Sequence, residues 1–174
     1  MKKAIWLWGL FGFAFTVLCG TVLHFLYGWL NDSAFIAPFS AVNESTFEHM
    51  KILFWPMLLF AVIQSFFFRE KSDFWCVKLH SILIGIFMIP LLFYTYNGAI
   101  GSSPAWLNIA FFFISAAAAY TYEVLIFKSN KGTCNNPKLA SIVLYIIMLS
   151  FILFTFAAPK IELFCDPITK TYGI

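Results

Sequence analysis

The chain has 174 residues, of which 61% are hydrophobic and 11% are charged, and its formal net charge is +3. A soluble domain carries roughly 25% charged residues, so this composition excludes an ordinary soluble fold. The charges flank long apolar runs and form no basic surface, which excludes nucleic acid as a partner. Runs of ~20 apolar residues are typical of transmembrane helices. The composition therefore predicts an all-α membrane protein whose surroundings are the lipid bilayer.

Five apolar runs predict a bundle of five transmembrane helices within one membrane domain, residues 1–174. The first run is too long for a secretory leader and lacks an Ala-x-Ala site, so we expect it to be retained as a span. Glycines in this run offer points of close approach to other helices. The expected spans are 4–30, 49–68, 77–97, 105–127 and 139–158, and a polar tail, residues 159–174, follows the last of them.

The basic residues predict the orientation of the bundle. Cytoplasmic loops of membrane proteins carry the excess of Lys and Arg. With the N-terminus in the cytoplasm, the chain places eight basic residues inside and three outside. The C-terminus is therefore expected to be extracytoplasmic, together with the segment between the first two spans. The inner set is Lys2, Lys3, Arg69, Lys71, Lys78, Lys128, Lys131 and Lys138, and the outer set is Lys51, Lys160 and Lys170.

The densest group of polar side chains lies in residues 41–51, just before the second span. Ser45 followed by Glu48 three residues later forms a capping box, which predicts that Ser45 caps a helix and that Glu48 bonds back to the Ser45 backbone N–H. Glu44 and Glu48 are four residues apart and share one face if both are helical. Lys51 is expected at the membrane interface.

Counting ~20 residues along each span places His24 and His49 at a similar depth on the same side of the membrane. A candidate binding cluster therefore combines His24, Asn43, Glu44, Glu48 and His49. Such groups can ligate a metal, relay protons, or act as general acid and base. The four His and Glu residues are the candidate metal ligands, although no HExxH motif is present. The alternative is that these residues only cap a helix, complement its dipole and line the interface.

The tail is the second outward feature. Its Asp166-Pro167-Ile168-Thr169 segment is typical of a turn. A tail of this length can fold over the cluster and bring Asp166 and Tyr172 to it. A frayed, solvated end is the usual alternative, but Leu163 and Phe164 favour docking against an apolar surface.

On the opposite side, Glu123 lies deep enough in the fourth span to need a partner. His80, Lys128 and Tyr122 are the available groups. A structural ion pair or a side chain that reaches toward the interface is the simpler explanation for Glu123.

Two motifs carry a family resemblance. The first is Val42-Asn43-Glu44-Ser45-x-x-Glu48-His49-x-Lys51, and the second is the ending Asp166-Pro167-x-Thr169-x-x-Tyr172-Gly173. Both resemble an uncharacterised family of small bacterial multi-pass membrane proteins. The resemblance extends over essentially the whole chain and implies a bacterial cell-membrane protein, but it implies no reaction.

The sequence is compatible with three functional classes. The first, which the outward cluster favours, is binding or assisted transport of a small molecule or ion. The second is a membrane-embedded enzyme that acts on a lipid or amphiphile. The third is an accessory subunit of a homo-oligomer or larger membrane complex. The sequence specifies neither a cofactor nor a catalytic residue.

Overall fold

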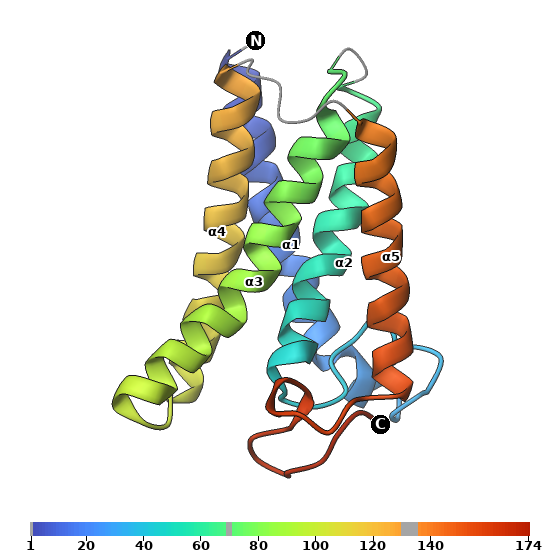
Figure 1. Cartoon of the computed structure of the whole chain (residues 1–174), viewed down its shortest axis with the longest axis vertical. Coiled ribbons are helices and arrows are strands. Elements are labelled where there is room, and N and C mark those ends of the chain that lie inside the picture. Colours follow the sequence, from blue (N-terminus) through green and yellow to red (C-terminus); the bar gives the residue numbers. More distant parts are fainter. Residues whose placement is uncertain (1, 69–70, 130–135) are drawn as a thin grey trace.

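The computed structural model describes residues 2–68, 71–129 and 136–174, and it confirms the all-α prediction for them. Within these ranges no β-strand occurs, only an isolated bridge between Cys165 and Tyr172. All five α-helices are long and apolar enough to cross a membrane, as in a multi-pass membrane protein. The helices are α1 (Lys2–Trp29), α2 (Thr46–Ser65), α3 (Phe74–Ile100), α4 (Ala105–Ser129) and α5 (Pro137–Phe156), followed by a short 3-10 helix, η1 (Glu162–Phe164) (Figure 1).

The helix bounds differ from the expected spans mainly at α2 and α3. α2 begins at Thr46, three residues before the expected start at 49, because Ser45 caps the helix there. α3 extends beyond its expected span at both ends, to Phe74 and Ile100. Counting from the hydrocarbon thickness gives only the membrane-embedded length, whereas a helix can continue into the interface. Part of the expected loop before α5, residues 130–135, lies outside the described residues.

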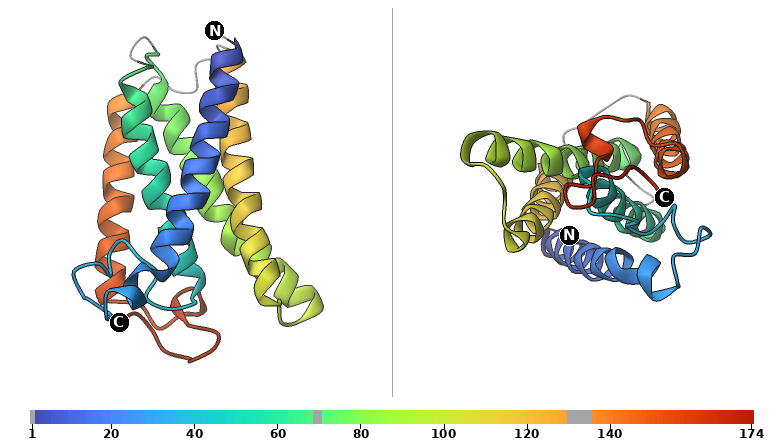
Figure 2. Two further views of the ribbon diagram at one scale, coloured as in Figure 1. Left: turned by 180° about the vertical axis from the view of Figure 1, so that it is seen from behind. Right: turned by 90° about the horizontal axis from the view of Figure 1, so that it is seen from below.

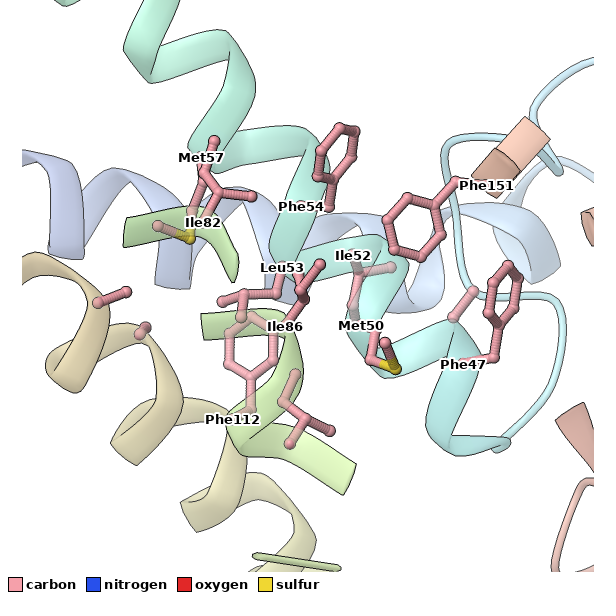
Figure 3. Close-up of a cluster of buried hydrophobic side chains, with 14 of the residues drawn as sticks. Phe47, Met50, Ile52, Leu53, Phe54, Met57, Ile82, Ile86, Phe112 and Phe151 are labelled. Atoms are coloured by element: carbon pink, nitrogen blue, oxygen red, sulfur yellow. The ribbon is translucent and has the colours of Figure 1, made fainter. Parts of the chain in front are cut away.

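α2 is the central helix of the bundle. Of its most apolar window 67% is buried, against 22% for the corresponding windows of α1 and α5. Its side chains Leu53, Phe54 and Met57 are at most 2% exposed. They belong to one core that α3, α4 and α5 complete, through Ile82, Ile86, Phe112 and Phe151 (Figure 3). Polar groups carried by α2 are therefore placed inside the protein unless they lie at its ends.

Two glycines of α1 allow the close packing that positions the site. A Cβ atom at Gly12 would collide with the Tyr120 ring, and one at Gly20 would lie 2.5 Å from the Phe112 ring. The expected role of these glycines as points of close approach is thus confirmed. A hydrogen bond of 2.8 Å between Thr16 and the Tyr120 hydroxyl joins the same two helices.

The bundle opens at one end. Beyond Pro90 no described residue of α3 is buried, and α4 becomes buried only from Phe111 onward. Figure 1 shows this α3–α4 hairpin leaning away from the other helices. The tail folds beneath the start of α2 at the same end of the molecule, opposite the N-terminus (Figures 1 and 2). We call this the tail end of the bundle and the other the N-terminal end.

Candidate functional site

The polar segment 41–51 divides at Ser45 into a turn and a helix. The Ser45 Oγ accepts a hydrogen bond from the Glu48 backbone N–H at 3.4 Å, which confirms the predicted cap. The predicted bond from the Ser45 backbone N–H to the Glu48 side chain was wrong. Glu48 instead accepts the Val42 backbone N–H at 3.0 Å. Glu44 precedes the helix, so it does not share a helical face with Glu48.

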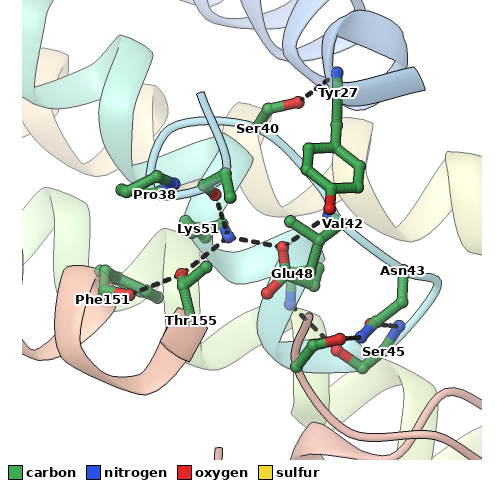
Figure 4. A network of polar contacts seen from close by, with 12 residues as sticks. Tyr27, Pro38, Ser40, Val42, Asn43, Ser45, Glu48, Lys51, Phe151 and Thr155 are labelled. Carbon is green, nitrogen blue, oxygen red and sulfur yellow. Dashed lines mark hydrogen bonds and ion pairs between the residues drawn. The ribbon is translucent and has the colours of Figure 1, made fainter. Parts of the chain in front are cut away.

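Glu48 and Lys51 form a closed, buried network (Figure 4). The Lys51 Nζ lies 2.6 Å from Glu48 Oε2 and donates to the Ala37 carbonyl at 2.8 Å and to the Thr155 hydroxyl at 2.9 Å. An ammonium group has three donors, and all three are used. Lys51 is 0% exposed, so its side chain is enclosed by protein. This network ties α2 to α5 and to the preceding loop.

Three other polar side chains converge beside this network. Glu44 lies between two imidazoles, with its carboxylate oxygens 3.8 Å from His24 Nε2 and 3.7 Å from His49 Nε2. The centroids of the two imidazole rings are 5.4 Å apart. One candidate ligand atom from each residue falls within 4.8 Å of the others. We call His24, Glu44 and His49 the triad; its members come from α1, the connecting loop and α2.

The ring nitrogens of the triad have different surroundings. His49 Nδ1 lies 2.9 Å from the Ser45 carbonyl, which can only accept, so this nitrogen carries the proton. In the neutral ring, the Nε2 lone pair of His49 then faces Glu44 and His24. His24 Nδ1 is buried and has no hydrogen-bond partner. The Glu44 side chain is 44% exposed, so the triad is accessible from the tail end.

The tail docks onto the turn that carries Glu44. Asp166 Oδ2 accepts the Glu44 backbone N–H at 3.3 Å, and the Asn43 side chain donates to the Gly173 carbonyl at 3.2 Å. The Phe164 ring packs on Phe47, with 4.4 Å between centroids. Asp166 and Asn43 thus contact the site through its backbone and do not face the imidazoles.

The other residues of the tail hold Asp166 in place. Burial alone would raise the pKa of Asp166, but backbone hydrogen bonds outweigh that effect and hold this pKa below its ordinary value. Tyr172 pairs with Cys165 in the isolated bridge and so closes the loop of the tail. The amides that donate to Asp166 belong to Ile168, Thr169 and Glu44.

A small cavity adjoins the triad where the α3–α4 hairpin leaves the bundle. Its volume is about 20 Å³, which is enough for one water molecule. Glu44, Thr46 and His49 form one wall. The other walls are formed by Ile89, Phe93, Asn108, Phe111 and Phe112.

A model for a family of unknown function (DUF6512) matches residues 1–174 of the chain. The protein belongs to that family. No curated protein and no solved structure matches it. The match covers the whole chain and specifies no activity, as expected for an uncharacterised family, so any function has to be argued from the geometry of the site.

This member of DUF6512 also carries a second buried ion pair, toward the N-terminal end. Lys78 Nζ lies 2.6 Å from Glu123 Oε2 and 5.6 Å from the centroids of the Phe60 and Phe74 rings. The other carboxylate oxygen, Glu123 Oε1, is buried without a partner. Sequence reasoning missed this pair because it placed the start of the third span at 77, which left Lys78 at the membrane edge.

The groups that the sequence offered to Glu123 have other contacts. His80 Nδ1 lies 3.3 Å from the Tyr122 hydroxyl, and Lys128 lies over the Trp6 ring at 4.1 Å. The true partner, Lys78, lies on α3 and Glu123 lies on α4, so the pair depends on how these two helices pack.

Proposed function

We propose that this protein is a multi-pass protein of the bacterial cytoplasmic membrane that binds a divalent transition-metal ion, such as Zn²⁺, at the triad. The observation that carries the proposal is the convergence of one candidate ligand atom each from His24, Glu44 and His49 within 4.8 Å. Imidazole nitrogen and carboxylate oxygen are ligands that Zn²⁺ accepts, and three such ligands leave one position open for water.

The spacing of the triad is close to what a metal needs. Ligands at 2.0–2.2 Å from Zn²⁺ in tetrahedral geometry are roughly 3.4 Å apart. One ligand atom from each residue lies within 4.8 Å of the others. The two Glu44 separations, 3.7 and 3.8 Å, involve different carboxylate oxygens and exceed ~3.4 Å by a few tenths of an ångström. They are also too long for hydrogen bonds. Small side-chain rotations would close the triad around an ion, and the adjacent cavity of about 20 Å³ has room for a water ligand.

The orientation of His49 supports metal binding further. Metal-bound histidines commonly donate their second ring N–H to a carbonyl or carboxylate, which fixes the tautomer. The bond between His49 Nδ1 and the Ser45 carbonyl is of this kind. It presents the Nε2 lone pair to the centre of the triad before any ion arrives.

We further propose that the tail end faces out of the cell. Lys51 and Lys78 are buried in ion pairs, so we leave them out of the count of basic residues on the two sides of the membrane. Each side loses one lysine. The count from the sequence then becomes seven basic residues for the inner side and two, Lys160 and Lys170, for the outer side. This distribution supports a cytoplasmic N-terminus, and the triad would then meet ions from the extracytoplasmic space.

Thermal unfolding of the purified protein tests metal binding. A ligand at one hundred times its Kd stabilises a protein by about 2.7 kcal/mol. We expect Zn²⁺ to raise the Tm of the wild type, Mg²⁺ to leave it unchanged, and His49→Ala or Glu44→Gln to remove the Zn²⁺ effect. His80→Ala, a histidine near the N-terminal end, is the matched control and should keep it. A wild type whose Tm does not respond to Zn²⁺ would overturn the proposal.

A further inference from the structure

The tail contacts the turn that carries Glu44, at the Glu44 backbone N–H and at the preceding Asn43 side chain. Glu44 precedes the Ser45 cap, so no helix fixes its backbone. Two hydrogen bonds from the tail hold this turn instead: Asp166 accepts the Glu44 backbone N–H, and Gly173 accepts from the Asn43 side chain. The Glu44 carboxylate meanwhile faces His24 and His49.

Hydrogen bonds within the tail hold the Asp166 side chain in one orientation. Its Oδ1 accepts the backbone N–H groups of Ile168 and Thr169 at 2.7 and 3.2 Å. Its own backbone N–H donates to the Thr171 carbonyl at 3.0 Å. The Asp166 side chain is therefore oriented by its own loop, and its second oxygen is directed at Glu44.

The apolar and close contacts of the tail fix its position on the bundle. Phe164 packs between Phe47 of α2 and Phe154 of α5, with centroid distances of 4.4 and 5.6 Å. Gly173 has a φ of +63°, and a Cβ atom there would lie 3.0 Å from the Thr155 carbonyl oxygen. Another residue would be strained at this point, and the glycine brings its carbonyl within reach of Asn43.

We propose that Asp166 is a positioning residue of the metal site, and that tail docking and metal binding strengthen one another. This inference rests on the proposed function. The docked tail holds the Glu44 backbone where its carboxylate lies between the two imidazoles. Coupling between two binding events is reciprocal, so a metal ion bound by Glu44 must stabilise the docked tail by the factor that docking adds to metal affinity.

The first test measures the Zn²⁺ Kd of variants at Asp166. Asp166→Ala removes the acceptor for Glu44, and we expect its Kd to rise 10- to 100-fold, as for other residues that orient metal ligands. Asp166→Asn keeps one side-chain oxygen, which the Ile168 and Thr169 amides use, and turns an NH2 donor toward the Glu44 N–H, so its Kd should rise as well. Asp32→Asn makes the same charge change in an exposed loop at the same end and should leave the Kd unchanged.

The second test reads the coupling from the tail. Hydrogen exchange of backbone amides in residues 164–173 should slow when Zn²⁺ is added to the wild type, and His49→Ala should abolish the slowing. If the tail had only a structural role, its backbone amides would exchange at the same rate with and without the metal. This measurement needs no variant at Asp166, so it tests the coupling between tail docking and metal binding even if Asp166→Ala fails to fold.

The outcomes separate this inference from the proposed function. If the wild type binds no Zn²⁺, the metal site is wrong and the positioning role falls with it. If the wild type binds Zn²⁺ but Asp166→Ala has the same Kd, or tail exchange ignores the metal, only the inference is overturned. A weaker Kd in Asp166→Ala together with metal-dependent protection of the tail supports both.

Discussion

Glu48 and His49 are neighbours in the sequence, yet they belong to two polar groups of opposite character. Glu48 is 1% exposed and its ion pair with Lys51 is 2.6 Å long, within a network in which every Lys51 donor is used. His49 belongs to the triad, where separations from Glu44 exceed hydrogen-bond length and one His24 nitrogen has no partner. Adjacent residues of a helix diverge by about 100°, which separates the two groups.

The two groups differ in whether their polar atoms already have hydrogen-bond partners, and this difference divides the polar motif by role. Buried polar groups that satisfy one another need no ligand, because their hydrogen-bonding capacity is already used. Groups that converge without satisfying one another retain the capacity to bind something else. By this criterion the Glu48–Lys51 network is structural, and the triad is the part of the motif for which we propose ion binding.

The largest expected effect comes from breaking the closed network. Lys51→Met would leave Glu48 buried without its counter-charge, and we expect the free energy of unfolding to fall by about 3–5 kcal/mol. Denaturant unfolding in detergent micelles would measure this change. Replacing both partners, as in Glu48→Leu with Lys51→Met, should be less harmful than the single change because no unpaired charge remains. A loss below about 1 kcal/mol for Lys51→Met would show that the network is not the structural element described.

A smaller effect is expected at the cap that separates the two groups. Ser45→Ala removes the side-chain acceptor of the Glu48 N–H but keeps the backbone carbonyl that orients His49. Stability should fall by about 1 kcal/mol, while the Zn²⁺ Kd should stay within twofold of the wild type. The same unfolding experiment and a Zn²⁺ titration check both numbers. A large loss of Zn²⁺ affinity in Ser45→Ala would mean that cap and triad are not separable.

The parts of this structure that sequence reasoning found depend on regular geometry. The pairing of His24 with His49 followed from helix length, because helix rise and membrane thickness set the depth of each residue. The Ser45 cap followed from local chemistry. Both are properties of short segments or single helices.

The parts that sequence reasoning missed depend on packing between segments. Nothing near Lys51 in the sequence shows that Thr155 and the Ala37 carbonyl will surround it. The partner of Glu123 is likewise on another helix, 45 residues away at Lys78. The tail was expected to dock, but its contact through the Glu44 backbone could not be predicted, since it requires the folded turn around Asp166.

The most direct test of the metal site is X-ray absorption spectroscopy of the Zn²⁺-loaded protein. The triad predicts two imidazole nitrogens at about 2.0–2.1 Å and oxygen ligands at about 2.0–2.2 Å, and His49→Ala should lose this spectrum. A Zn²⁺ ion with sulfur ligands, or one whose spectrum is unchanged in His49→Ala, would contradict binding at His24, Glu44 and His49.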